Sequence, residues 1–112
     1  MRGFDVVPLR GPEGPRRDLE LLTASQRVEV FERLEGVSNN DLFAMGRLRW
    51  PRGEHGAWVY LRLGEWFLLC QWDKGQPGLW RDGIGRGTLT ICRLADGPGF
   101  DEILKERERA AK

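Results

Sequence analysis

The segment from Trp58 to Trp72 constrains the fold more than any other part of the chain. It consists of two runs rich in aromatic and branched residues, separated by the dipeptide Gly64-Glu65. This spacing predicts a β-hairpin with a two-residue loop of type II′, in which glycine takes the position that needs a positive φ. The second run is apolar at nearly every position, which predicts a strand covered on both faces. The rest of the chain must therefore pack onto this hairpin.

Length and composition limit the possible classes. The 112 residues support a single domain, 1–112, and a hydrophobic content of 40% is enough for a modest core. The net charge is only +1, from 18 basic and 17 acidic residues, so bulk charge does not argue for a nucleic-acid binder, although local patches stay open. No apolar run approaches the roughly 18 residues of a membrane span, and residues 1–8 lack the apolar stretch of a secretory signal. We therefore expect a cytoplasmic protein with no membrane partner, unless the chain is processed.

Two cysteines, Cys70 and Cys92, both fall inside expected strands. We expect reduced thiols in the core rather than a disulfide, because cytosolic thiols stay reduced. Two cysteines and one histidine cannot by themselves make a standard four-ligand zinc site. We therefore expect neither a metal nor a small-molecule cofactor.

Turn and capping residues divide the remaining chain into short elements. Thr23 and Gln26 have the spacing of a capping box and predict the start of a helix, for which Gly36 is a plausible end. The apolar residues of this helix recur at helical spacing and are Val30, Phe31, Leu34 and Val37. The other expected elements are a strand at 4–9, a helical segment at 16–22, a loop at 38–41, strands at 45–50 and 88–94, a long loop at 73–87, and a C-terminal helix at 101–111 with a frayed end. Helices followed by a run of strands predict an α+β fold with an antiparallel sheet.

Four segments resemble a known family. The segments 17–22 and 26–34 are similar to the paired N-terminal helices of the RelE/ParE toxin superfamily. The segment 60–70 resembles the hairpin of that family, in which an arginine, an apolar residue, a glycine and a polar residue precede an aromatic residue, a second arginine and an apolar strand. The segment 100–105 resembles the aromatic residue and short helix that close many members. The resemblance spans most of the chain, although each motif is short and degenerate.

The resemblance implies both a fold and a function. The fold would be α+β, with an N-terminal strand and a helical pair packed on a curved antiparallel sheet of about four strands, and a short C-terminal helix. The function would be that of the toxin in a toxin–antitoxin system, blocked by an antitoxin segment that wraps around it. RelE-like members are metal-independent endoribonucleases that cut mRNA in the ribosomal A site, whereas ParE-like members inhibit DNA gyrase. The implied partners are an antitoxin-like protein and, for a RelE-like member, the ribosome with its mRNA.

The resemblance also implies candidate catalytic residues. Arg62 corresponds to the first hairpin arginine of the family, and Arg93 supplies positive charge near the end of the last strand. The chain departs from the family at Phe67, which replaces the second hairpin arginine, and at Phe100, which replaces a closing tyrosine and has no hydroxyl. Metal-free RNA cleavage needs placed acids and bases as well as cations, and arginine stays protonated. Arg62 and Arg93 could therefore contact phosphate, but no residue evident in the sequence supplies the proton transfer.

Other basic and aromatic residues are candidates for binding RNA or a protein partner. Arg47 and Arg49 alternate with apolar residues and, if they share a sheet region with Arg62, form either a phosphate-binding patch or simply the solvated face of a strand. The expected loop at 73–87 combines a tryptophan with positive charges, which suits base stacking, a protein-binding hot spot, or a tryptophan that anchors the loop on the core. The loop residues concerned are Lys74, Trp80, Arg81 and Arg86.

The single histidine, His55, lies beside Glu54 and could form an acid–base pair, but a lone histidine in a turn rich in proline and glycine is more often just exposed. Four tryptophans are most simply core or sheet-covering side chains, and any that is exposed would indicate a partner surface. They are Trp50, Trp58, Trp66 and Trp72.

The sequence is compatible with two functions of different classes. The first is a toxin-like protein that acts on mRNA at the ribosome, or on gyrase, and so influences translation or replication. The second is a non-catalytic protein-binding or regulatory module on the same fold. Near-neutral charge and the missing cations favour the second, whereas the match over the helices and the hairpin favours the first.

Overall fold

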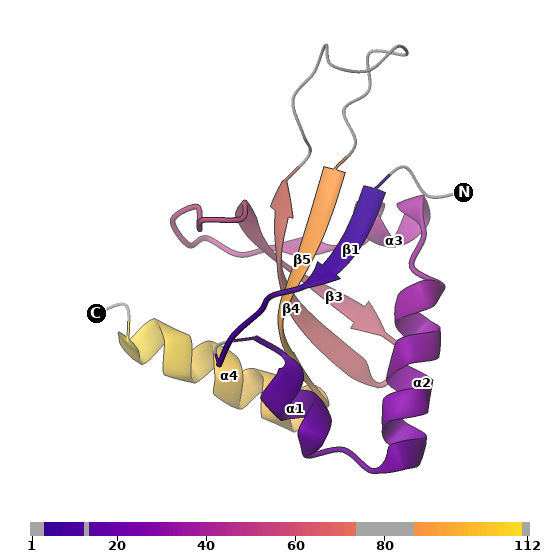
Figure 1. Cartoon of the computed structure of the whole chain (residues 1–112). Coiled ribbons are helices and arrows are strands. Elements are labelled where there is room, and N and C mark those ends of the chain that lie inside the picture. Colours follow the sequence, from indigo (N-terminus) through magenta and orange to yellow (C-terminus); the bar gives the residue numbers. More distant parts are fainter. Residues whose placement is uncertain (1–3, 13, 74–86, 111–112) are drawn as a thin grey trace.

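The computed structural model describes residues 4–12, 14–73 and 87–110, which form five strands and four helices (Figure 1). The strands form one sheet in the order β1-β5-β4-β3-β2. The predicted α+β class is therefore confirmed. The elements are β1 (Phe4–Pro8), α1 (Arg16–Glu20), α2 (Ala24–Glu35), α3 (Asn39–Phe43), β2 (Gly46–Arg47), β3 (Ala57–Leu63), β4 (Trp66–Asp73), β5 (Gly87–Ala95) and α4 (Gly97–Ala110).

The predicted hairpin is present. Strands β3 and β4 pair antiparallel, with Leu63 opposite Trp66 at the turn. Gly64 has a φ of +66°, and no non-glycine residue in the described part of the chain has a positive φ, so the loop matches a type II′ turn. A Cβ atom at Gly64 would lie 3.2 Å from the guanidinium of Arg33, so α2 reaches the hairpin turn.

The sheet is mixed and has one strand more than expected, because β1 joins it in parallel. Its register runs from Phe4 opposite Gly87 to Pro8 opposite Ile91, whereas the other strand pairs are antiparallel. A parallel pair requires a long crossover connection. Between β1 and β2 the chain passes through three helices, α1, α2 and α3, and then reaches the opposite edge of the sheet (Figure 1). Local patterns therefore predicted the strand but not its partner or its direction.

The sheet separates two hydrophobic clusters. The cluster that includes Val30 of α2 defines what we call the α2 face of the sheet, and the cluster that includes Phe100 of α4 defines the α4 face. In β3, Val59 belongs to the α2 face and Trp58 to the α4 face, as the alternation of side chains along a strand requires. Strand β4 is buried on both faces, as predicted, with side chains such as Leu68 and Leu69 in opposite clusters.

Helix α2 begins at the predicted capping box. The backbone N–H of Gln26 donates to Thr23 Oγ1 at 3.2 Å, and the backbone N–H of Thr23 donates to Gln26 Oε1 at 2.9 Å. Val30 is only 2% exposed, but Phe31, expected on the same apolar stripe, is 51% exposed. Consecutive residues of an α-helix differ in direction by about 100°, so the two side chains cannot both face the core centre.

Several predicted boundaries are wrong. Most of the segment 38–41, which was expected to be a loop, lies in helix α3. The start of α3 is fixed by a hydrogen bond from the backbone N–H of Ser38 to Asp41 Oδ2 at 2.7 Å. The expected strand at 45–50 is reduced to the two residues of β2. Helix α4 begins four residues before the expected Asp101, because the Asp96 carboxylate accepts the Gly99 N–H at 2.9 Å and satisfies a free donor of the first turn.

Candidate functional site

Arg93, one of the two candidate catalytic residues, is held by Asp18 of α1. Its Nε donates to Asp18 Oδ2 at 2.9 Å, and its Nη2 donates to Asp18 Oδ1 at 3.1 Å. These two hydrogen bonds to Asp18 are the main reason why the pKa of Arg93 is raised above its usual value. Two of the N–H donors of Arg93 are therefore directed at a carboxylate of the protein itself.

Arg62, the other candidate, is exposed at the end of β3. Its Nε donates to the Gly64 carbonyl at 3.0 Å, and its guanidinium carbon lies 5.6 Å from the centre of the Phe67 ring. Phe67 in turn stacks on Phe100 of α4, with ring centres 5.3 Å apart and an angle of 19° between the planes. Arg62 thus supports the hairpin turn and packs on an aromatic pair that joins α4 to the sheet.

The structure does not bring Arg62 and Arg93 together. Arg62 lies opposite Phe67 of β4, and Arg93 lies opposite Leu69 of the same strand, so β4 separates the two arginines. His55 lies elsewhere, in the turn between β2 and β3, where its backbone N–H donates to Gln71 Oε1 at 2.7 Å. Its Nε2 is 4.0 Å from a Glu54 oxygen, and both side chains are substantially exposed. The described residues therefore place no histidine beside either candidate arginine.

Arg47 does not lie on the same face of the sheet as Arg62. Arg47 pairs with Val59 of the α2 face, whereas Arg62 pairs with Phe67 of the α4 face. Because directly paired residues project to the same side of a sheet, the two arginines project to opposite sides. Arg49 follows β2 and is also exposed. Arg47 and Arg62 therefore do not belong to one phosphate-binding patch.

The remaining candidate residues lie outside the described part of the chain. They are Lys74, Trp80, Arg81 and Arg86. Their proposed role in binding RNA or a partner stays a prediction.

The tryptophans and cysteines of the described chain belong to the packed interior. Trp58 is 9% exposed and Trp66 is 7% exposed, and both contribute to the clusters on either side of the sheet. Cys70 and Cys92 are buried free thiols, as predicted. Burial raises the pKa of the Cys70 thiol well above its usual value and that of Cys92 to about 11. A protonated buried thiol is a poor nucleophile, so neither cysteine is suited to catalysis.

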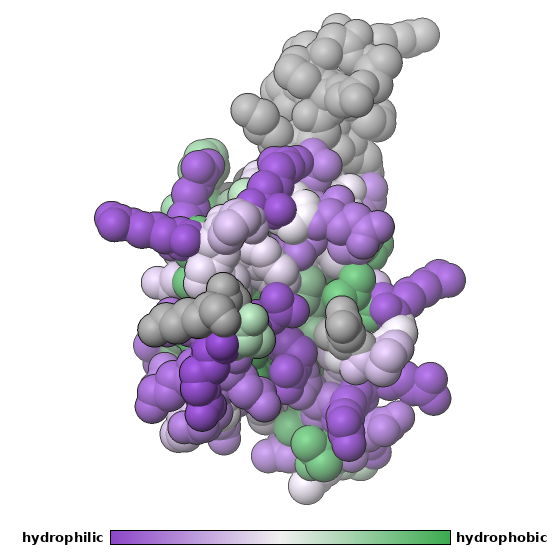
Figure 2. All heavy atoms as spheres, turned by 90° about the vertical axis from the view of Figure 1, so that its left-hand side faces the viewer, coloured by the Kyte–Doolittle hydropathy of each residue, from purple (hydrophilic) through white to green (hydrophobic). Residues whose placement is uncertain are grey.

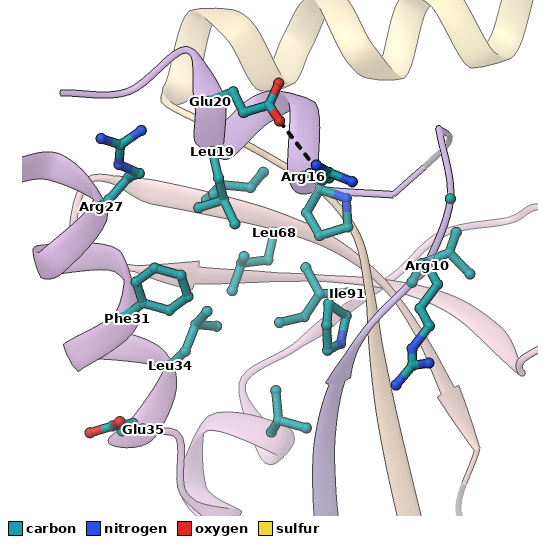
Figure 3. A pocket seen from close by; sticks show the side chains of 16 residues that line it. Arg10, Arg16, Leu19, Glu20, Arg27, Phe31, Leu34, Glu35, Leu68 and Ile91 are labelled. Carbon is teal, nitrogen blue, oxygen red and sulfur yellow. Dashed lines mark hydrogen bonds and ion pairs between the residues drawn. The ribbon is translucent and has the colours of Figure 1, made fainter. Parts of the chain in front are cut away.

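A groove that the sequence did not predict opens on the α2 face of the sheet, between α1, α2 and β1 (Figure 3). Its volume is about 750 Å³. Leu68 and Ile91, both buried core side chains, lie at its base, and Phe31 of α2 points toward its centre. A groove of this size and polarity can hold apolar side chains of a ligand.

Charged side chains line the groove alongside these apolar residues. Arg16 and Glu20 of α1 pair with each other at 3.3 Å, while Arg27 and Glu35 belong to α2. The sequence did carry one signal of the groove. An apolar phenylalanine directly follows the buried Val30, which makes the apolar stripe of α2 wider than the core needs.

The side of the molecule that carries the end of α4 is mainly hydrophilic. Figure 2 shows that hydrophilic side chains cover most of it, with hydrophobic atoms visible only in small separate areas. Phe31, at 51% exposed, adds an aromatic side chain to the groove lining, whereas the more exposed Phe43 of α3, at 89%, lies outside that lining.

None of the helices in the described residues is long and apolar enough to cross a membrane. Those residues also contain no cluster of three or more histidine, cysteine, aspartate or glutamate side chains that could hold a metal ion. Comparisons of the chain with protein-family models, with curated proteins and with solved structures find no match.

Proposed function

We propose that this chain is a non-catalytic protein-binding module, and that its binding site is the groove between α1 and α2. The observation that carries the proposal is a groove of about 750 Å³ whose apolar lining includes the half-exposed Phe31 and the partly exposed Leu19 and Leu34, above buried core side chains. Apolar surface in contact with water is unfavourable by roughly 25 cal/mol per Å², and burying it on a partner recovers this free energy. An amphipathic helix laid into an apolar groove is a common form of protein recognition. The proposal places the protein in the cytoplasm with a protein partner.

The two arginines support a binding role over catalysis. Arg93 directs two donors at Asp18, and Arg62 directs its Nε at the Gly64 carbonyl. Cleavage of RNA without a metal needs a base for the 2′-hydroxyl and an acid for the leaving oxygen in addition to cations. Neither arginine can be that base, because its guanidinium does not lose its proton.

The proposal is tested by site-specific photocrosslinking in cells. A photoreactive phenylalanine analogue replaces Phe31, and a matched control carries the same analogue at Glu102, an exposed residue of α4. We expect an adduct of defined mass from position 31 and none from position 102. If the two positions give the same adducts, or if position 31 gives none, the groove is not the binding site.

A toxin-like activity on mRNA at the ribosome is the second candidate function. One observation favours it: the side chain of Arg62 is exposed at the end of β3, so its guanidinium is accessible to a phosphate of RNA. The test is expression of the chain alone, with growth and ribosome-dependent mRNA cleavage read by primer extension. This activity predicts growth arrest that Arg62→Ala relieves, and a gyrase supercoiling assay would identify a ParE-like action instead. Normal growth of cells that express the folded chain would remove both toxin functions.

A further inference from the structure

Helix α2 carries a charge pattern that is complementary to itself. Arg27 precedes Phe31 by four residues and Glu35 follows it by four residues, and all three line the groove. Residues four apart on a helix lie on one face. Figure 3 shows Arg27 and Glu35 at opposite ends of this face with Phe31 between them. The order along the face is therefore cation, aromatic ring, anion.

These charges are free to serve an interface. The nearby Arg16 is paired with Glu20 within α1 at 3.3 Å. By contrast, within residues 4–12, 14–73 and 87–110, Arg27 and Glu35 take part in none of the ion pairs. The apolar side chains beside them are also uncovered, since Phe31 is 51% exposed and Val28 is 57% exposed.

A two-fold axis beside Phe31 would match this pattern to a second copy. Two α2 helices that cross antiparallel at Phe31 bring the two rings together at the axis. Because Arg27 and Glu35 are equally distant from Phe31 in the sequence, Arg27 of each copy then lies opposite Glu35 of the partner subunit. Such a contact is isologous, so each favourable pair occurs twice.

We propose that the partner bound at the groove is a second copy of this chain, held by an antiparallel contact of the two α2 helices centred on Phe31. This inference rests on the proposed function and names the partner of the same site. An unrelated helix would need an apolar face alone, whereas the placement of opposite charges at equal distances from Phe31 fits this chain's own helix. The grooves of the two copies then face each other, and the exposed parts of their apolar linings leave water together.

Exchanging the two charges tests the inference. Sedimentation equilibrium of the full chain gives the dimer dissociation constant for the wild type, Arg27→Glu, Glu35→Arg and the double variant. We expect the wild type to dimerise, each single exchange to weaken the dimer at least about tenfold through like-charge contacts, and the double exchange to restore it. Glu102→Arg on α4 makes the same change of charge away from the groove and should leave the constant unchanged. Circular dichroism melting curves establish that each variant is folded.

The results separate the dimer from the broader binding function. A wild type that stays monomeric at millimolar concentration, or a dimer that withstands both single exchanges, overturns the second copy as partner. In the photocrosslinking experiment, an adduct of twice the chain mass from position 31 supports the dimer. An adduct with a different protein overturns the dimer but leaves the groove as a binding site, and the absence of any adduct overturns both.

Discussion

The carboxylate of Asp18 accepts the backbone N–H of Leu94 at 3.1 Å, although 76 positions separate the two residues in the sequence. Strand β1 ends its pairing with β5 at Pro8 and Ile91, so the edge of β5 beyond that point lacks a neighbouring strand. Asp18 supplies the acceptor that a longer β1 would have supplied. The same carboxylate holds Arg93 through two further hydrogen bonds. One side chain of α1 therefore fixes that helix to the open edge of the sheet.

Asp18→Ala should lower the free energy of unfolding by about 2–3 kcal/mol, because the Leu94 N–H and two Arg93 donors lose their acceptor together. The matched control is Glu20→Ala on the same helix. Within the part of the chain that the structure describes, the ion-pair partner of Glu20 is Arg16, and both of those side chains are exposed. This control should change stability by less than about 0.5 kcal/mol. Urea denaturation measures both values, and equal losses would contradict the role of Asp18.

Gly64→Ala should destabilise the protein by about 1–2 kcal/mol, because an L-residue in the left-handed region brings its Cβ close to its own backbone. Gly64 has a φ of +66°, and its added Cβ would also lie 3.2 Å from Arg33. Gly36→Ala is the matched control, since Gly36 has a φ of −84° and its added Cβ would make ordinary contacts of 3.6 Å with the carbonyl oxygens of Glu32 and Arg33. Thermal melting should show Gly36→Ala to be neutral or stabilising. A tolerated Gly64→Ala would be inconsistent with the type II′ turn.

Features that depend on neighbouring residues were predictable from the sequence. The hairpin follows from two β-rich runs separated by a glycine-containing dipeptide, and the start of α2 follows from Thr23 and Gln26. In each case the residues that determine the structure lie within a few positions of one another. Short-range backbone geometry and capping hydrogen bonds are therefore sufficient to specify these elements.

Features that depend on distant residues were not predictable. Nothing in the segment 4–9 indicates that it pairs with β5, because a strand's own pattern specifies which side chains are buried but not which strand lies beside it. The pairing of Asp18 with Arg93 joins positions 75 apart, and the groove exists only where α1, α2 and β1 meet. Arg62 and Arg93 were identified by resemblance, and their separation by β4 follows from the strand order alone.

Truncating the small side chain of Val30 to alanine should destabilise the protein more than truncating the larger side chain of its neighbour Phe31. Val30→Ala removes a side chain that is 2% exposed and should cost about 2 kcal/mol of unfolding free energy through lost burial and a residual cavity. Phe31→Ala removes a larger side chain, but that side chain is 51% exposed, so the cost should stay near 0.5 kcal/mol in the monomer. Urea denaturation at a protein concentration too low for self-association makes the comparison. A larger loss for Phe31→Ala would mean that α2 is rotated from the described orientation.

The buried thiols should make stability fall as the pH rises above about 9. In the unfolded chain a cysteine ionises near pH 8.5, whereas in the folded protein desolvation raises the pKa of Cys92 to about 11 and that of Cys70 well above its usual value. Between these pH values the folded state binds more protons than the unfolded state, so the free energy of unfolding decreases with pH, by at most about 1.4 kcal/mol per pH unit for each thiol. Urea denaturation between pH 8 and pH 10.5 measures the slope.

The corresponding control separates the thiols from the other groups that titrate in this range. Cys92→Ala lowers stability at every pH through lost packing, but it also removes one titrating group from the buried set. Its slope between pH 9 and pH 10.5 should therefore be shallower than that of the wild type, and the slope of Cys70→Ala should be shallower as well. If both variants keep the wild-type slope, the two thiols do not cause the loss of stability at high pH.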